Sequence, residues 1–169
     1  MEQPATKGRT GGFAETTLAN GRTAVAFVFN MAVHQRAHSI RPPGKGLHEI
    51  TELVAREVKL CGLSDGTATI FCQHTSCSLI IMENADPTAR ADLESWFERL
   101  VPESDAHFEH TLEGPDDMPA HIKMALTRTS ETVPFSNGKL LLGTWQGIYL
   151  WEHRKQGHAR TVIITVHGG

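Results

Sequence analysis

The chain has 169 residues, of which 40% are apolar and 21% charged, and its formal net charge is −3. This length and composition are typical of one globular domain with a single core. The slightly acidic balance argues against a nucleic-acid partner, and no apolar run approaches the roughly 18 to 20 residues that a membrane span needs. The three cysteines form no CxxC pair, which favours a reducing, cytoplasmic location.

The first 34 residues are predicted to form an N-terminal extension. Residues 1–21 are rich in Gly, Thr and Ala and show neither helical nor strand periodicity, which favours disorder. The apolar run that follows is interrupted by Asn30, so it fits a signal peptide poorly. The alternative to a disordered extension is that translation starts at Met31 and that the preceding segment is wrongly included in the sequence.

From His34 onward the sequence pattern becomes regular. The first helix is expected to end at Gly62, and the second has Asp86 as its N-cap and Pro87 at its first position. The predicted strands cover residues 34–43, 66–76, 77–83, 129–135, 138–154 and 160–168, and the predicted helices cover 46–62, 86–102 and 115–126. Helices scattered among strands without a βαβ rhythm favour one compact α+β domain over residues 35–169, with two to three helices and a mixed or antiparallel sheet or sandwich.

A histidine and a thiol lie close together in the stretch "QHTSCSLIIMENADP", residues 73–87. Strand alternation places Ile70, Cys72 and His74 on one face, so His74 is expected at the strand end, where it faces a cleft or is hydrogen-bonded in the core. Cys77 follows three residues later and allows a Cys–His nucleophile, as in a cysteine-dependent hydrolase. The alternative is a small buried thiol at the start of an apolar strand.

The densest polar group of the chain is "HFEHTLEGPDDMPAHIK", residues 107–123. His110 and His121 flank Glu113, Asp116 and Asp117, and the four-residue spacing of Asp117 and His121 puts them on one helix face. Carboxylates at a helix start also serve as caps, which explains one aspartate but not the whole group. Nitrogen and carboxylate ligands together suit zinc or another borderline divalent ion, and the spacing favours an open site.

The stretch "GTWQGIYLWEHR", residues 143–154, is predicted to be a strand with polar groups along one face. Gln146, Glu152 and Arg154 share that face with apolar residues, and such groups are costly to bury without partners. The expected partners are a ligand or a neighbouring subunit. His153, adjacent to Glu152, is expected on the opposite side of the sheet.

As a set, "QHTSCSLIIMENADP", "HTLEGPDDMPAHIK", "GKLLLGTWQGIYLWEHR" and "RTVIITVHG" resemble the YjbQ-like family, over residues from about Gln35 to Gly169. The resemblance implies a compact α+β subunit that forms a homotrimer. It also implies the activity described as secondary thiamine-phosphate synthase, which joins a pyrimidine methyl diphosphate to a thiazole phosphate and releases pyrophosphate. In the family the position of Cys77 can hold alanine, which argues against a cysteine nucleophile.

The first hypothesis is therefore a metal-assisted transferase that uses a divalent metal ion, zinc or magnesium, and a small phosphorylated molecule. The metal ligands are expected to be His74, His110, His121 and Asp116. Catalytic roles are expected for Asp117, Glu152 and Arg154, with Arg154 as a phosphate clamp, and substrate binding for Ser76, Asn84, Trp145 and Gln146. The second hypothesis is a non-catalytic trimer that binds a metal or a ligand.

Overall fold

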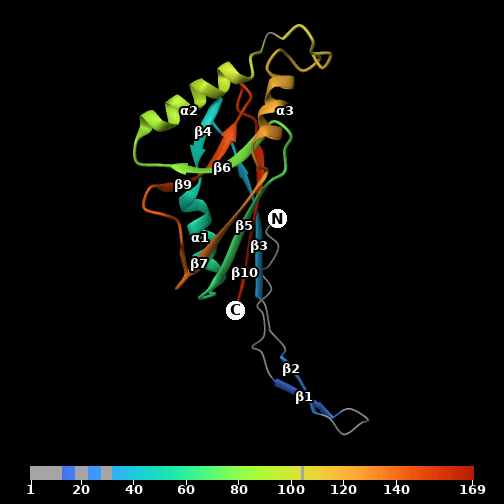
Figure 1. Cartoon of the computed structure of the whole chain (residues 1–169), viewed down its shortest axis with the longest axis vertical. Coiled ribbons are helices and arrows are strands. Elements are labelled where there is room, and N and C mark those ends of the chain that lie inside the picture. The colour runs from blue at the N-terminus through green and yellow to red at the C-terminus, as the bar shows by residue number, and fades with distance from the viewer. Residues whose placement is uncertain (1–12, 18–22, 28–31, 104) are drawn as a thin grey trace.

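The computed structural model describes residues 13–17, 23–27, 32–103 and 105–169. Over these residues the chain contains three helices, α1 (Thr51–Cys61), α2 (Pro87–Leu100) and α3 (Asp117–Leu126). The strands are β1 (Phe13–Thr17), β2 (Thr23–Phe27), β3 (Ala32–Ile40), β4 (Gly46–Glu49), β5 (Gly66–Cys72), β6 (Cys77–Glu83), β7 (Ser130–Ser136), β8 (Lys139–Leu140), β9 (Gln146–Glu152) and β10 (Arg160–Gly168). The predicted α+β class is confirmed (Figure 1).

The strands form two main sheets in which all pairs are antiparallel. A five-stranded sheet has the order β3-β10-β5-β7-β8, and a three-stranded sheet has the order β4-β9-β6. The link of residues 73–76 carries the chain from β5 in the first sheet to β6 in the second. Of the alternatives left open by the sequence, the structure has the antiparallel one.

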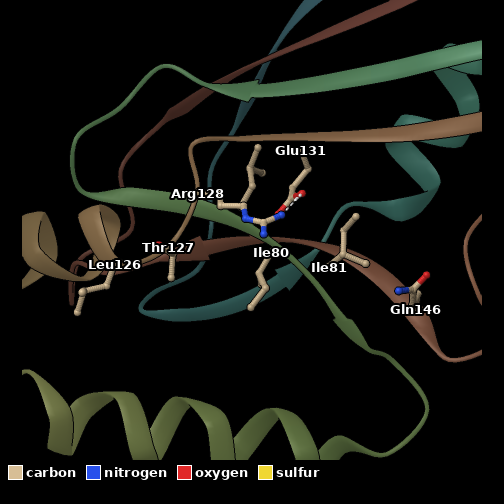
Figure 2. A pocket seen from close by; sticks show the side chains of 8 residues that line it. Ile80, Ile81, Leu126, Thr127, Arg128, Glu131 and Gln146 are labelled. Atoms are coloured by element: carbon tan, nitrogen blue, oxygen red, sulfur yellow. Dashed lines mark hydrogen bonds and ion pairs between the residues drawn. The ribbon is translucent and has the colours of Figure 1, made fainter.

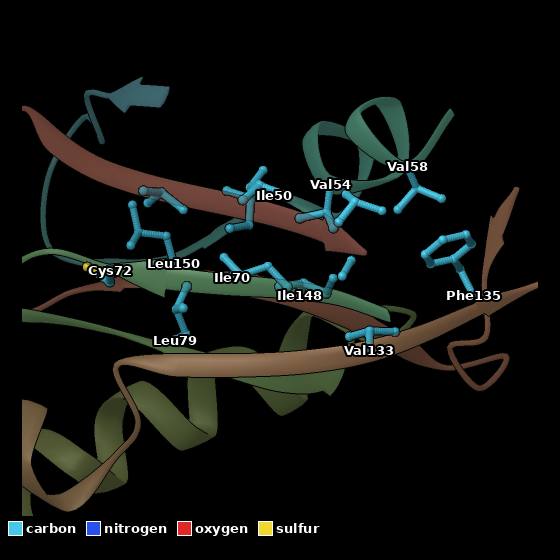
Figure 3. Packing of buried hydrophobic residues seen from close by; sticks show 14 of the residues in the cluster. Ile50, Val54, Val58, Ile70, Cys72, Leu79, Val133, Phe135, Ile148 and Leu150 are labelled. Carbon is cyan, nitrogen blue, oxygen red and sulfur yellow. The ribbon is translucent and has the colours of Figure 1, made fainter. Parts of the chain in front are cut away.

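The main core lies between the two sheets and includes one face of α1. Val54 and Val58 of the helix pack there with Ile70 of β5 and with Ile148 and Leu150 of β9 (Figure 3). The opposite face of the three-stranded sheet is covered by α2, in a smaller cluster of Leu47, Phe97, Tyr149 and Trp151. Because β9 is covered on both faces, its residues 147–152 are all buried, apolar and polar alike.

The predicted helix over residues 46–62 is wrong in its first turn. Residues 46–49 are β4, because Gly46 to Glu49 pair with Glu152 to Tyr149 of β9 and tertiary pairing overrides the helical pattern. The helix begins at Thr51 and ends, as predicted, at Gly62, whose φ of 72° is the left-handed conformation that glycine adopts readily. The predicted cap of α2 is also confirmed, because Asp86 accepts a hydrogen bond from the Thr88 backbone N–H at 2.8 Å.

Three predicted strands are too long. The strand predicted over residues 34–43 ends at Ile40. The strand predicted over residues 66–76 ends at Cys72, where its pairing with β10 stops at Val162. The strand predicted over 138–154 divides into β8 and β9, because Gly143 accepts a hydrogen bond from the Gln146 backbone N–H at 2.9 Å and closes a turn between them.

The structure describes part of the predicted N-terminal extension. β1 and β2 pair with each other from Phe13↔Phe27 to Thr17↔Thr23. β1 lies in the segment where the sequence pattern indicated disorder, and β2 lies in the apolar run that follows it. β3 begins at Ala32, three residues before the expected domain boundary. Met31 lies outside the described residues. Within the described part of the chain, no helix is both long and apolar enough to cross a membrane.

Candidate metal centre

The first turns of α3 assemble two histidines and one carboxylate. His110, Asp117 and His121 each place a nitrogen or oxygen within 4.8 Å of the others. Asp117 Oδ2 lies 2.8 Å from His110 Nε2 and 3.3 Å from His121 Nε2. Asp117 and His121 meet because they are one helical turn apart, whereas the loop before α3 returns His110 to the same point.

The orientation of His121 is fixed from a distant part of the sequence. Its Nδ1 lies 2.7 Å from the carbonyl oxygen of Thr75, in the link between β5 and β6. A carbonyl accepts only, so Nδ1 carries a hydrogen and donates it, which leaves Nε2 as the ring nitrogen that can bind a metal ion. Nε2 faces the Asp117 carboxylate, so a cation between the two groups would contact both.

Asp117 is almost fully buried, and Arg154 balances its charge. The Arg154 guanidinium donates to Asp117 Oδ1, to Asp116 Oδ2 at 3.3 Å and to the Glu113 carbonyl oxygen at 2.7 Å. With Oδ1 held by Arg154, Oδ2 of Asp117 points toward the two histidines. The Arg154 donors are thus engaged within the chain, a geometry that suits positioning of the carboxylate more than the predicted clamp on phosphate.

Asp116 lies outside the group of His110, Asp117 and His121 and anchors a neighbouring loop. Its Oδ2 accepts from the backbone N–H of Lys155 at 2.8 Å as well as from Arg154. Burial opposes the ionisation of this carboxyl, but the Lys155 N–H and the Arg154 charge outweigh burial and hold the pKa of Asp116 below its usual value. The carboxylate that joins the two histidines is Asp117, not Asp116, which the sequence pattern favoured as a ligand.

His74 is next to Thr75 in sequence but outside the group of His110, Asp117 and His121. Its Nε2 accepts a hydrogen bond from the Thr161 backbone N–H at 2.7 Å, which ties the 73–76 link to the start of β10. Burial, reinforced by the nearby Arg160, lowers the pKa of His74 and keeps the ring neutral. The observed contacts of His74 hold the link that positions His121.

Glu152 has a partner that the sequence pattern did not reveal. The Arg160 Nε donates to Glu152 Oε2 at 2.6 Å and its Nη2 donates to Oε1, while Nη1 reaches the Ser76 hydroxyl at 3.1 Å. Glu152 is 0% and Arg160 4% exposed. The expectation of a ligand or a second subunit as partner of Glu152 is corrected: β10 supplies it from the same chain. In the sequence, this ion pair is indicated only by Arg160 itself, a charged residue at the start of an apolar strand.

His153 is also buried, on the other side of the strand. Its Nε2 lies 2.8 Å from the Ser78 hydroxyl, and its ring packs against Phe97 and Trp151. Burial, together with the nearby positive charges of Lys123, lowers the pKa of His153 to about 3. This histidine is therefore neutral and structural at neutral pH.

Three predicted substrate-binding residues lie at the opposite end of the three-stranded sheet. Asn84 donates its backbone N–H to the Trp145 carbonyl at 3.0 Å, and Gln146 Oε1 accepts from the Gly143 N–H at 2.8 Å. The length of β6 separates them from Ser76, at about 3.3 Å per residue or roughly 20 Å in total. The structure therefore does not bring Asn84, Trp145 and Gln146 together with the histidines within one chain.

An open groove of about 510 Å³ lies at the other end of α3 from the histidines (Figure 2). Its lining is half polar and half apolar, and two of the lining residues, Arg128 and Glu131, form an ion pair at 3.4 Å. Along α3, His121 is five residues, or about 7.5 Å, from Leu126 at the groove. The groove residues are Leu79, Ile80, Ile81, Leu126, Thr127, Arg128, Glu131 and Gln146.

The fold and this site define a class of protein: a small α+β protein of curled antiparallel sheets with an open histidine–carboxylate group at the start of its last helix. The family model described as "UPF0047 protein YjbQ-like" matches residues 36–169. The chain belongs to this family.

Similar proteins occur in bacteria and archaea. A UPF0047 protein of Synechocystis sp. is 50% identical over 135 residues, which are 80% of this chain and 92% of that protein. The UPF0047 protein YjbQ of Escherichia coli O157:H7 is 39% identical over 80% of this chain and 98% of its own length.

Solved structures show the same fold. A protein of the yjbq/upf0047 family from Clostridium acetobutylicum is 34% identical, with a TM-score of 0.69, over 79% of this chain and 98% of that chain. A YbjQ-like protein of unknown function from Sulfolobus solfataricus P2 aligns with a TM-score of 0.75 at 23% identity, over 83% of this chain and the whole of that one.

Proposed function

We propose that His110, Asp117 and His121 bind a divalent metal ion and that the protein uses it to act on a small phosphorylated molecule. The observation that carries this proposal is the geometry of His121. Its Nδ1–H donates to the Thr75 carbonyl, and its Nε2 faces the Asp117 carboxylate at 3.3 Å. Histidine ligands of metals commonly have such a backbone acceptor on the other ring nitrogen.

The donor set fits zinc better than magnesium. Two imidazole nitrogens and one carboxylate oxygen are usual zinc ligands, whereas magnesium is bound mainly by oxygens. His110 is about half exposed (48%) and His121 is 28% exposed, so solvent or a substrate has access to the open side. Three protein ligands and an accessible position are typical of catalytic rather than structural zinc sites.

The charges around the group favour binding of a cation, and the bound cation would then allow an anion to bind. Glu113, Asp116 and Asp117 carry three negative charges and Arg154 one positive charge, which leaves about two negative charges near the histidines. A phosphorylated molecule is repelled by this balance unless a divalent cation offsets it. When bound, such an ion supplies Lewis-acid stabilisation of phosphate or pyrophosphate oxygens.

The reaction in this proposal is a transfer of the thiamine-phosphate synthase type, which the family resemblance implies. In that reaction a pyrimidine methyl diphosphate is joined to a thiazole phosphate and pyrophosphate leaves. Arg154 would hold Asp117, and the Thr75 carbonyl would hold His121, in position to bind the ion. We also expect assembly into a trimer, with a mass in sedimentation equilibrium three times the 18.6 kDa of one chain.

Metal binding is tested first. In calorimetric titration with zinc, the His121→Ala variant should bind at least about 100-fold more weakly than the unmodified protein, because loss of a ligand costs no less than the 10–100-fold typical of its supporting partners. The matched control is His107→Ala, which removes an exposed histidine from the same loop and should bind normally. Equal affinity in both variants would exclude the proposed site.

Catalysis is tested with the same variants. Formation of thiamine phosphate and pyrophosphate from the two phosphorylated substrates should require the metal, be lost in His121→Ala and persist in His107→Ala. If the protein binds metal but turnover stays at background, the transferase part of the proposal is refuted and a metal-binding protein without this activity remains.

A further inference from the structure

Two buried cysteines from different strands meet below the 73–76 link. Cys72 is the last residue of β5 and Cys77 the first of β6, and their Sγ atoms lie 2.8 Å apart. They are 1% and 0% exposed, respectively. The third cysteine, Cys61, is separate, because its Sγ donates to the Val58 carbonyl within α1.

The two thiols are held together by the rigid elements that carry them. β5 is paired with β10 and β7, and β6 is paired with β9, so neither strand end is free to move away. Because the sulfur atoms are already 2.8 Å apart, a disulfide of about 2.05 Å requires only a small further approach of the two strand ends. Simple packing brings buried thiols into the same core but does not by itself require their sulfur atoms to face each other.

The link between the two cysteines is partly exposed, since Gln73 and Thr75 within it are exposed. It is held by hydrogen bonds to neighbouring segments: Gln73 N–H donates to the Thr161 carbonyl at 3.0 Å, Thr161 N–H donates to His74, and Arg160 donates to Ser76. Local opening of these contacts gives a small oxidant access to the sulfur atoms without unfolding of the sheets.

We propose that Cys72 and Cys77 form a reversible intramolecular disulfide and that small disulfides such as oxidised glutathione are the oxidant. One cysteine loses its proton to solvent, and its thiolate attacks the small disulfide, forming a mixed disulfide and releasing one thiolate of the oxidant. The second cysteine, deprotonated in turn, attacks the protein sulfur of the mixed disulfide and releases the other. Two protein thiols are oxidised, and one small disulfide is reduced to two thiols.

The disulfide also bears on the metal site, and this part rests on the function proposed above. The link between the two cysteines contains Thr75, whose carbonyl orients His121. Closing the bond draws the ends of the link together and shifts this acceptor. Since supporting partners of metal ligands carry about 10–100-fold in affinity, the oxidised protein should bind zinc at least about tenfold more weakly.

The disulfide is tested in a Cys61→Ser background, which leaves only the two buried thiols. After treatment of the folded protein with oxidised glutathione, denaturation and alkylation, intact mass should show loss of two hydrogen atoms and no alkylated cysteine, and dithiothreitol should restore both thiols. Two alkylated cysteines, a persistent glutathione adduct or a disulfide between chains would each overturn the proposal. The Cys61→Ser/Cys72→Ala control should form no internal bond.

Zinc titration of the oxidised and reduced forms completes the test. Weaker binding after oxidation supports the link to His121, and unchanged binding refutes it. If neither form binds zinc while the disulfide forms, the metal site fails and the disulfide stands. If zinc binds and no disulfide forms, the metal site stands and the disulfide is refuted.

Discussion

The buried Glu152–Arg160 pair gives the sharpest prediction of stability. Replacing Arg160 with methionine keeps much of the side-chain volume but removes the donors to both oxygens of Glu152 and to the Ser76 hydroxyl. Glu152, which is 0% exposed, is left with one hydrogen bond to its carboxylate, from the Arg154 backbone N–H at 3.0 Å. An unpaired charge remains inside the protein.

The expected cost follows from this geometry. Removal of one partner from a buried ion pair costs about 3–5 kcal/mol in the free energy of unfolding, a large fraction of the roughly 5–15 kcal/mol of a typical domain. For a chain of this length that corresponds to a decrease of about 6–20 °C in Tm, at roughly 2–4 °C per kcal/mol. Truncation of an exposed lysine in an ion pair costs no more than about 1 kcal/mol.

Urea denaturation at pH 7, followed by far-ultraviolet circular dichroism, measures these free energies. The matched control is Lys155→Met, which removes a 61%-exposed partner of Glu103. The double variant Glu152→Gln/Arg160→Met removes both charges and keeps an acceptor for the Arg154 N–H. It should be at least about 2 kcal/mol more stable than Arg160→Met alone. A double variant no more stable than the single one would refute the reasoning that the unpaired charge dominates the loss.

Two further predictions concern the core and the acid response. Leu79→Ala opens a cavity at a 0%-exposed position between the sheets and should lower the free energy of unfolding, measured by urea denaturation, by about 2–5 kcal/mol. The control Leu141→Ala, at a 58%-exposed position, should change it by no more than about 0.5 kcal/mol. Equal losses in the two variants would contradict the observed packing. Because burial lowers the pKa of His153 to about 3, the unfolded chain binds a proton below pH 6.5 that the folded chain does not, so stability falls as pH falls. Between pH 6.5 and 5 this amounts to about 2 kcal/mol, and His153→Gln should reduce the decline by that amount; equal declines in both proteins would count against a buried neutral ring.

Local signals in the sequence were sufficient for several elements of the fold. Asp86 and Pro87 mark the start of α2, and Gly62 marks the end of α1, because caps depend on residues within one turn of the helix. The paired strand at residues 46–49 was not predictable in this way. Its apolar residues continue the helical pattern, and only the presence of β9 beside it decides that the backbone pairs as a strand.

In the candidate site too, residues close in sequence were predictable and contacts between distant segments were not. The spacing of Asp117 and His121 placed them on one helix face, and the sequence also marked His110 as a member of the group. Which aspartate joins the histidines depended on Arg154, whose hydrogen bonds turn Asp117 toward them and hold Asp116 away.

The α+β class, most helix and strand positions and the polar segment before α3 are predictable from the sequence, because hydrophobic period, capping and short spacings act over a few residues. The contacts of Arg160 with Glu152, of Thr75 with His121 and of Cys72 with Cys77 are visible only in the folded chain. Strand pairing and the crossing between sheets set those contacts. A spacing along the chain specifies distance within one helix or strand, but not which strand ends come to lie side by side.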